Sequence, residues 1–311
     1  PANTSSSQGS GPAGSDAQLR VIATPGFADY ALIDSGNGRK LERFGRFTVD
    51  RPEPQAMWQP VLEPGVWLRA DAVFKGSGDE EDGEGGRWRK LKPMPETWPV
   101  RVLDVTALCR LTGFRHLGIF PEQLPHWQWM LAWLRELRVE PPRVLNLFAY
   151  TGAASLIAAA AEAEVTHVDA SKKAIVWAKE NRAVSKLDEA AIRWIVEDAR
   201  KFVAREVRRE KRYDGILLDP PKYGRGPEGE VWRLEEDVPD VIANCRKLLD
   251  ANSRFLFLTV YAVRMSALAL GGLLQSHFHD LPGKVEFGEL SVREQARGLL
   301  LPTAIFARWS Q

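Results

Sequence analysis

Short apolar runs alternate with segments of helical periodicity from about residue 111 to the end of the chain. The runs of strand length lie at 144–148, 164–168, 192–196, 215–218 and 254–260. Before and between them, apolar residues recur three and four positions apart over 125–137, 153–163, 172–184 and 238–249. This alternation predicts an α/β fold built on a doubly wound, mostly parallel sheet. Two last apolar runs, 285–290 and 299–309, can add a closing pair of strands.

The first third of the chain has a different pattern, because its apolar runs are short and separated by turn signals. Gly, Pro and Asp, as in Ser35-Gly36-Asn37-Gly38, divide runs at 19–23, 30–33, 47–49, 66–74, 87–91 and 100–102. These short strands predict a smaller β-rich N-terminal domain over 17–110, ahead of an α/β domain at 111–311. Residues 1–16 are rich in Ser, Gly, Pro and Asn, and we expect a disordered tail there.

The composition is that of a globular protein, with 44% hydrophobic and 27% charged residues among 311. No apolar stretch approaches the roughly 20 residues of a membrane-spanning helix. No basic-then-apolar leader opens the chain, so we expect a cytoplasmic protein without membrane contact. Cys109 and Cys245 lie far apart within apolar patterns, which favours core positions over a disulfide or a zinc site.

Charge adds little to this picture, since the formal net charge is only +1. Basic residues do gather between 200 and 212, where a helix could contact a phosphate backbone. The alternative is a solvated helix face whose charges pair with Glu206 and Glu210. His277 and His279 have no evident cluster of further ligands nearby in the sequence, so we predict no metal site.

The residues that end the predicted strands form an ordered set. The first strand leads into a turn at Gly152, the second ends at Asp169 and the third at Asp198. In an open α/β sheet, ligands bind outside the carboxyl ends of the strands. Asp169 lies about 20 residues after the glycine turn, the offset at which an acid commonly binds the ribose hydroxyls of a nucleoside.

The sequence of the glycine turn limits which class of ligand it can bind. A dinucleotide-binding loop prefers Gly-x-Gly-x-x-Gly. This loop has only one glycine, which follows the bulky Phe148 and Tyr150 and precedes the predicted helix. A nucleoside without phosphates fits better, which favours S-adenosylmethionine over NAD. The alternative is that these acids only cap helices and end strands, which would account for Ser171 and one Asp.

The fourth strand ends in Asp219-Pro220-Pro221, followed by Lys222 and Tyr223. Each proline fixes its own φ and removes an N–H, so the loop offers rigid acceptors and few donors. Rigid acceptors suit an amino group or a base edge. Tyr223 could then stack on a base, and Lys222 could hold a phosphate or the Asp219 carboxylate. A strand ended by two prolines is the structural alternative.

Taken in order, these motifs resemble those of class I S-adenosylmethionine-dependent methyltransferases. They are most similar to the bacterial 23S ribosomal RNA methyltransferases that carry Asp-Pro-Pro-Lys. Gly118-Ile119-Phe120-Pro121-Glu122-Gln123 resembles the Gly-x-Phe-x-x-Gln segment of that family. The resemblance covers roughly 114–260, and it implies a Rossmann-like doubly wound sheet with S-adenosylmethionine as cofactor.

The resemblance also implies roles for individual residues. The residues that would bind the cofactor are Phe120, Gln123, Phe148, Thr151, Gly152, Asp169, Ala170, Ser171, Asp198, Ala199 and Asp219. The residues that would act on the substrate are Asp219, Pro220, Pro221, Lys222 and Tyr223.

The expected substrate is a base of ribosomal RNA, with RNA as the partner. Nitrogen is favoured over cytosine C5, because C5 methylation needs a thiol and the fifth strand ends Thr259-Val260-Tyr261-Ala262 without cysteine. A methyltransferase acting on a small molecule or a protein is the alternative. An NAD-dependent dehydrogenase and a non-catalytic RNA-binding protein are more distant alternatives.

Overall fold

The computed structural model describes residues 18–76, 86–137, 141–261 and 264–311. The expected disordered tail, 1–16, lies outside the described residues. No helix within the described ranges is long and apolar enough to cross a bilayer.

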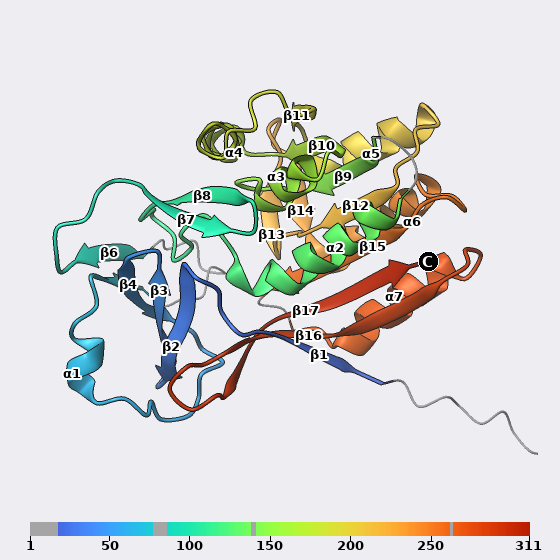
Figure 1. Ribbon diagram of the computed structural model, residues 1–311. Helices are drawn as coiled ribbons and strands as arrows, with labels where there is room; N and C mark the ends of the chain where they lie inside the picture. Colours follow the sequence, from blue (N-terminus) through green and yellow to red (C-terminus); the bar gives the residue numbers. More distant parts are fainter. Residues whose placement is uncertain (1–17, 77–85, 138–140, 262–263) are drawn as a thin grey trace, which may run out of the picture.

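The α/β part is built on one eight-stranded sheet, in the order β1-β16-β17-β15-β12-β9-β10-β11 (Figure 1). Strands β9 to β12 and β15 pair in parallel, and β17 runs antiparallel between β15 and β16. The strands of this sheet are β1 (Arg20–Thr24), β9 (Arg143–Leu147), β10 (Glu164–Asp169), β11 (Ile192–Val196), β12 (Gly215–Leu218), β15 (Phe255–Tyr261), β16 (Lys284–Arg293) and β17 (Leu300–Ser310). The predicted doubly wound, mostly parallel sheet is confirmed.

Helices cover both faces of this sheet, and the alternation of side chains along β9 shows how. Val144 packs into the core that holds α2 and α3, whereas Leu145 and Leu147 pack into the core that holds α5, α6 and α7. Near-continuous burial along the central strands follows from this two-sided cover. The helices of this part are α2 (Leu124–Glu136), α3 (Ala153–Ala160), α4 (Lys172–Val184), α5 (Ala199–Arg208), α6 (Leu234–Lys247) and α7 (Ala267–Phe278).

The N-terminal part is rich in strands, as predicted. A five-stranded sheet has the order β2-β3-β4-β5-β6, and β7 and β8 form a separate pair. Its elements are β2 (Tyr30–Gly36), β3 (Arg39–Phe44), β4 (Phe47–Pro52), α1 (Pro64–Trp67), β5 (Ala72–Lys75), β6 (Arg87–Lys90), β7 (Trp98–Val102) and β8 (Val105–Cys109). The single strand expected at 66–74 is wrong: Pro64 occupies the first position of the short helix α1, and the strand begins only at Ala72.

Strand β1 does not join the N-terminal sheet, although its residues precede it in the chain. It pairs in parallel with β16, so that Arg20 lies opposite Gly288. The two backbones are close, because a Cβ placed on Gly288 would lie 1.7 Å from the Arg20 carbonyl oxygen. A glycine at 288 therefore makes this edge pairing possible.

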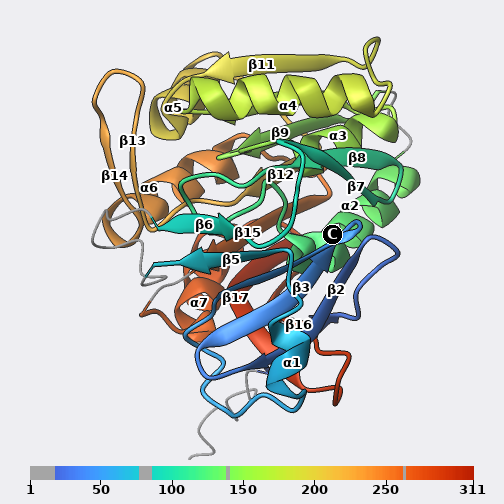
Figure 2. The ribbon, with the colours of Figure 1, turned by 90° about the vertical axis from the view of Figure 1, so that its left-hand side faces the viewer.

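The loop between β16 and β17 fastens the N-terminal sheet to the α/β part (Figure 2). The Arg297 guanidinium donates to the Ser35 carbonyl at 2.7 Å and to the Gln59 carbonyl at 2.9 Å. The buried Glu294 carboxylate accepts from the Ser35 hydroxyl and from Arg297. The two parts are thus joined by polar contacts, of which the one between Ser35 and Glu294 is buried, as well as by apolar packing.

Candidate functional site

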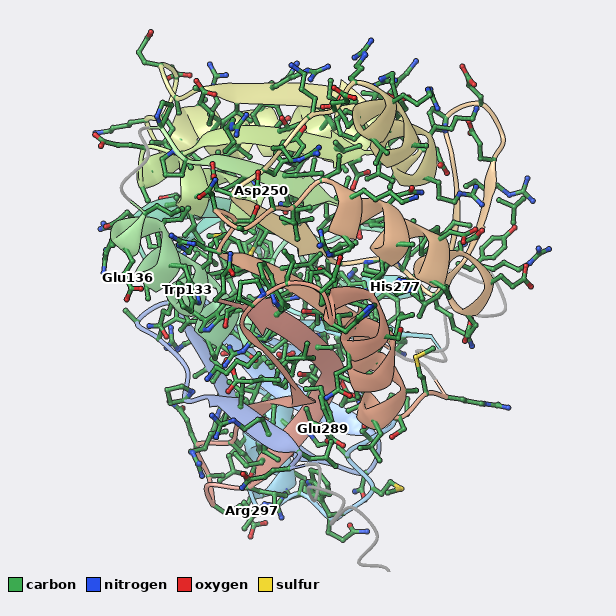
Figure 3. All side chains as sticks on the ribbon, turned by 90° about the vertical axis from the view of Figure 1, so that its right-hand side faces the viewer. Trp133, Glu136, Asp250, His277, Glu289 and Arg297 are labelled. Atoms are coloured by element: carbon green, nitrogen blue, oxygen red, sulfur yellow. The ribbon has the colours of Figure 1, made fainter. Side chains whose placement is uncertain are left out.

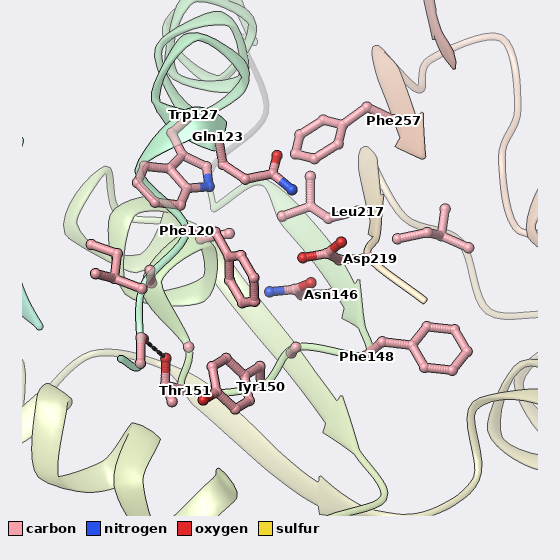
Figure 4. A pocket seen from close by; sticks show the side chains of 17 residues that line it. Phe120, Gln123, Trp127, Asn146, Phe148, Tyr150, Thr151, Leu217, Asp219 and Phe257 are labelled. Carbon is pink, nitrogen blue, oxygen red and sulfur yellow. Dashed lines mark hydrogen bonds between the residues drawn. The ribbon is translucent and has the colours of Figure 1, made fainter. Parts of the chain in front are cut away.

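A pocket lies at the carboxyl ends of β9 and β12, against the segment that precedes α2 (Figure 4). The strand order reverses at β9, which has β10 on one side and β12 on the other. This is the switch point at which doubly wound sheets bind ligands. Its lining residues include Gly118, Phe120, Gln123, Trp127, Asn146, Phe148, Tyr150, Thr151, Gly152, Asp219 and Phe257.

The turn that follows β9 adopts a strained backbone. Phe148 and Tyr150 have φ values of 56° and 49°, in the left-handed region that bulky residues rarely adopt. Gly152, with φ of 84°, completes the turn and precedes the first residue of α3. The Asp169 carboxylate holds the turn by accepting from the Tyr150 N–H at 2.7 Å. Strain of this kind persists where the surroundings enforce it, and it gathers at ligand sites.

Asp169 therefore has a visible structural task. Its Oδ2 accepts from Tyr150, and its Oδ1 accepts from the Ser171 N–H at 2.8 Å. Burial raises the pKa of Asp169, and the two backbone N–H groups oppose that rise. Each carboxylate oxygen can accept a second hydrogen bond, so Asp169 can still bind hydroxyls beside the pocket. Ala170 separates it from Ser171, which caps α4 by accepting from the Ala174 N–H at 3.2 Å.

Asp198 is the N-cap of α5. Its carboxylate accepts from the N–H groups of Arg200 at 2.9 Å and Lys201 at 3.2 Å, and it pairs with the Arg200 guanidinium. Neither Asp198 nor the buried Ala199 lines the pocket. In this structure the Asp198 side chain caps a helix, which is the alternative role that the sequence also allowed. A position of Asp198 beside the adenine of the cofactor stays a prediction. Lys201 and Arg205 on the same helix are paired with glutamates.

Asp219 lies at the centre of the pocket, and one of its carboxylate oxygens is unpartnered. Oδ1 is buried and accepts no hydrogen bond from any described residue. Burial raises the pKa of Asp219 well above its ordinary value, and the nearby Glu122 carboxyl raises it further. A hydrogen bond with Gln123 opposes the rise. Figure 4 shows the Gln123 and Asn146 amides beside the carboxylate, while Phe148 points away from it.

Gln123 is itself held on both ends of its amide. Its Nε2 donates to the Tyr261 hydroxyl at 3.0 Å, and its Oε1 accepts from the Thr259 hydroxyl at 3.3 Å. Because the amide has a second N–H, it can contact Asp219 at the same time. The first two contacts therefore orient the Gln123 amide that contacts Asp219.

Aromatic rings form a wall of the pocket. The Phe120 and Tyr150 rings both line it, with their centroids 5.8 Å apart. Tyr261 does not line the pocket, but its ring supports Phe120 at a centroid distance of 5.2 Å. Tyr261 was not predicted as a site residue. It ends the fifth strand, so its position at a strand end is the signal that could have found it. Asn146 lies within the motif at the end of β9, but it was not predicted as a site residue.

The residues after Asp219 do not line the pocket. The Pro221 carbonyl accepts from the Trp232 indole N–H at 2.6 Å, and the Lys222 carbonyl accepts from the Leu234 N–H at 3.0 Å. Tyr223 opens a short hairpin, β13 (Tyr223–Arg225) and β14 (Val231–Arg233), and its side chain is 53% exposed. Asp219 is thus the one residue of Asp219-Pro220-Pro221-Lys222-Tyr223 that the structure brings into the pocket.

Two buried histidines near the sheet are neutral. Burial lowers the pKa of His126 and of His167 to about 3. His167 Nδ1 lies 3.0 Å from the Ser155 hydroxyl, which accepts from the Asn146 amide at 2.9 Å. These two hydrogen bonds fix the Asn146 side chain at the pocket. Among the described residues, no group of three or more His, Cys, Asp or Glu side chains could hold a metal ion.

Gly118 places the pocket wall close to Trp177. Its φ is 104°, and a Cβ there would lie 2.2 Å from the Trp177 ring. Gly118→Ala should therefore lower the free energy of unfolding by about 2 kcal/mol, from overpacking together with backbone strain. Gly113→Ala is the matched control, since a Cβ at 113 would meet nothing within 4 Å. Equal urea midpoints for the two variants would contradict the expected close contact.

Comparison with solved structures finds a near full-length relative. The crystal structure of the SAM Dependent Methyltransferase from Agrobacterium tumefaciens is 46% identical in sequence, with a TM-score of 0.89. The match covers 95% of this chain and 96% of that one. The structure of SMU.776 complexed with SAH has a TM-score of 0.69 over 90% of this chain and 75% of that one. At 17% identity, this second likeness shows the fold alone.

Comparison with protein families and with curated proteins finds matches to part of the chain. The model of the family described as conserved hypothetical protein 95 matches residues 128–231. The ribosomal RNA large subunit methyltransferase K/L of Shewanella frigidimarina is 36% identical over 152 residues, which are 47% of this chain. That of Syntrophotalea carbinolica is 28% identical over 173 residues, which are 55% of this chain. The chain spans 20% and 23% of the length of these two relatives.

Proposed function

Because the chain belongs to the S-adenosylmethionine-dependent methyltransferases, we propose that it methylates a nitrogen of a ribosomal RNA base. The observation that carries the proposal is the Asp219 carboxylate, whose buried Oδ1 has no partner among the described residues. A buried acceptor without a hydrogen bond costs free energy, so a ligand that donates an N–H to it would be bound favourably. Amino and ring N–H groups of bases supply that donor.

The residues at the turn after β9 fit the cofactor. The left-handed Gly152 brings the backbone beside Ala178 and His167, where a Cβ would lie 3.0 Å from the Ala178 Cβ. Asp169 stands beside this turn with lone pairs for ribose hydroxyls, and the pocket wall holds apolar rings. When bound, S-adenosylmethionine supplies a methyl group already activated by its sulfonium. Phe120, Phe148, Thr151 and Gly152 would hold it, with Asp169 at the ribose.

The chain's own contribution is positioning. Asp219 would accept a hydrogen bond from the base through Oδ1, with its orientation set by Gln123 and, behind it, Tyr261. Fixing a nucleophile in line with its target can contribute several kcal/mol to lowering the barrier. The raised pKa of Asp219 makes its carboxylate a better acceptor for the proton that a methylated nitrogen loses.

Cysteine placement supports nitrogen over cytosine C5. The chain has two cysteines, and C5 methylation needs a thiolate that reaches the base. Both thiols are fully buried, neither lines the pocket, and burial raises the pKa of each. A thiol in that state is a poor nucleophile. A nitrogen, by contrast, needs only to be oriented.

The substrate class rests on the curated relatives. The K/L proteins are named as ribosomal RNA large subunit methyltransferases, and the family model that matches 128–231 covers the turn after β9 and Asp219, which both line the pocket. Such an enzyme reaches its base in an unpaired region or by flipping it from the helix.

Transfer of labelled methyl from S-adenosylmethionine to large-subunit ribosomal RNA transcribed in vitro tests this function. We expect label in the RNA, and digestion to nucleosides should yield an N-methylated base. Label confined to added protein or small metabolites would exclude the RNA proposal. Label recovered as 5-methylcytosine would retain RNA as substrate and overturn the choice of nitrogen.

A further inference from the structure

We propose that the outer face of the β13–β14 hairpin binds an unpaired RNA segment next to the target base, an inference that rests on the proposed function. The ligand would be recognised by stacking on Tyr223 and by phosphate contacts of Arg225 and Arg233. Tyr223 would thus contact a flanking base outside the pocket rather than the base being methylated.

The hairpin has two chemically different faces. Tyr223 pairs with Arg233, Gly224 with Trp232, and Arg225 with Val231. Because side chains alternate along a strand and align across a pair, Tyr223, Arg225, Val231 and Arg233 share one face. Tyr223, Arg225 and Arg233 on this face are exposed, whereas Trp232 on the other is 3% exposed.

The inner face anchors the hairpin to the site. The Trp232 ring packs 4.7 Å from that of Phe148, which belongs to the strained turn, and its indole donates to the Pro221 carbonyl. The Arg200 guanidinium lies 6.0 Å from the Trp232 ring. An isolated two-stranded hairpin is barely stable, so this anchor is what holds the outer face in place.

The hairpin also lies where a substrate strand would pass. It begins four residues after Asp219 and stands out from the body beside α5 and α6, as the views from opposite sides show (Figures 2 and 3). A nucleic acid whose base enters the pocket at Asp219 must continue past the pocket rim, and β13 extends from that rim.

The charge on this face suits phosphate. Arg225 pairs with no carboxylate among the described residues. Arg233 pairs with Glu236 at 3.2 Å, but both side chains are more than half exposed, so the pair is weak and a phosphate can replace it. The acids at the hairpin turn, Glu228 and Glu230, are already paired with Lys201.

An exposed tyrosine beside two arginines fits a single strand better than a duplex. Unpaired bases stack on aromatic side chains with little regard to sequence, while arginines follow the backbone. A protein partner would not require a flat ring exposed between two cations next to a base-sized acceptor site.

Fluorescence anisotropy with a labelled single-stranded RNA of about 12 nucleotides tests the surface on the full chain with S-adenosylmethionine present. Tyr223→Ala should weaken binding about 5- to 100-fold with an unchanged salt slope. Arg225→Gln and Arg233→Gln should each reduce the slope of log affinity against log salt by about 0.7. Calorimetric affinity for S-adenosylmethionine should stay the same in all three.

Arg135→Gln is the matched control. Arg135 is exposed at the end of α2, next to Glu136, which lies on the opposite side of the molecule from the hairpin (Figure 3). The RNA affinity and the salt slope of the Arg135→Gln variant should equal those of the natural chain. If the natural chain methylates RNA and the hairpin variants bind and methylate it equally well, the inference fails and the proposed function stands. If the natural chain neither binds nor methylates RNA, both fail.

Discussion

Asp219→Asn is expected to keep the fold and the cofactor affinity while slowing methyl transfer at least about 100-fold. The substitution keeps the shape of the side chain but exchanges a charged acceptor for a neutral amide. Its N–H groups would face the donors of Gln123 or of the base. The free energy of unfolding should not fall, because the variant no longer has to bury an ionisable carboxyl at this position.

The pH dependence separates this role from a structural one. Burial and Glu122 raise the folded pKa of Asp219 above its ordinary 3.8, so the folded chain binds this proton more tightly than the unfolded chain. Raising the pH from 3.8 through the folded pKa therefore lowers the contribution of Asp219 to the free energy of unfolding. Transfer should rise over the same window, as the carboxylate forms.

Single-turnover rates and urea unfolding across this pH range are the measurements. In the Asp219→Asn variant, the rate should no longer rise with pH, and the part of the pH-dependent change in the free energy of unfolding that comes from Asp219 should be absent. Asp280→Asn, which alters an exposed carboxylate paired with Arg246, is the control and should change neither. A rate for Asp219→Asn within threefold of the natural chain would remove Asp219 from the proposed mechanism.

Arg51→Met is expected to lower the free energy of unfolding by about 3–5 kcal/mol, the largest stability effect predicted for this chain. Arg51 and Glu42 are buried in the N-terminal sheet, and the Arg51 Nη2 donates to Glu42 Oε1 at 3.0 Å. Burial alone would raise the pKa of Glu42, but Arg51, Lys40 and the Tyr30 hydroxyl lower it to about 2. Removing Arg51 leaves a buried carboxylate without its main partner.

The double variant Glu42→Gln/Arg51→Met should recover much of this loss, because it removes both charges of the buried pair and leaves neither without its partner. In the natural chain, Glu42 stabilises the fold above its unfolded pKa of 4.5, and that contribution disappears as the pH falls through about 2. Lys92→Met, which breaks the more exposed pair with Asp71, should lower the free energy of unfolding by less than about 1 kcal/mol. Equal urea midpoints for Arg51→Met and Lys92→Met would contradict the assignment.

The α/β sheet was readable from sequence because its strands and helices are long and strongly periodic. The strands 192–196 and 215–218 and the helix 172–184 have the predicted bounds. The hairpin at Tyr223 was missed, since each of its strands has three residues and its stability comes from Trp232 packing on Phe148. Three residues carry no periodic signal, and contacts across the chain are invisible to a local pattern.

The site was predictable by position more than by role. Strand ends located Gly152 and Asp219 in the pocket, because the carboxyl edge of a parallel sheet is fixed by topology. Asp198 shows the limit of this reasoning, since an acid before a helix can cap it as readily as it can face a ligand. The strain at Phe148 and Tyr150 could not be foreseen, because it exists only where Asp169 and the sheet enforce it.

The pairing of β1 with β16 also sets the order in which the protein can be built. The Ser291 hydroxyl donates to the Ile22 carbonyl across 269 positions of sequence. During synthesis, β1 emerges before β16 and cannot pair with it until β16 has left the ribosome. Contacts of such long separation form slowly, so this edge of the sheet should be the last to assemble. Until then, β1 lacks the strand that pairs with it among the described residues, and its N–H and C=O groups stay open to other strands.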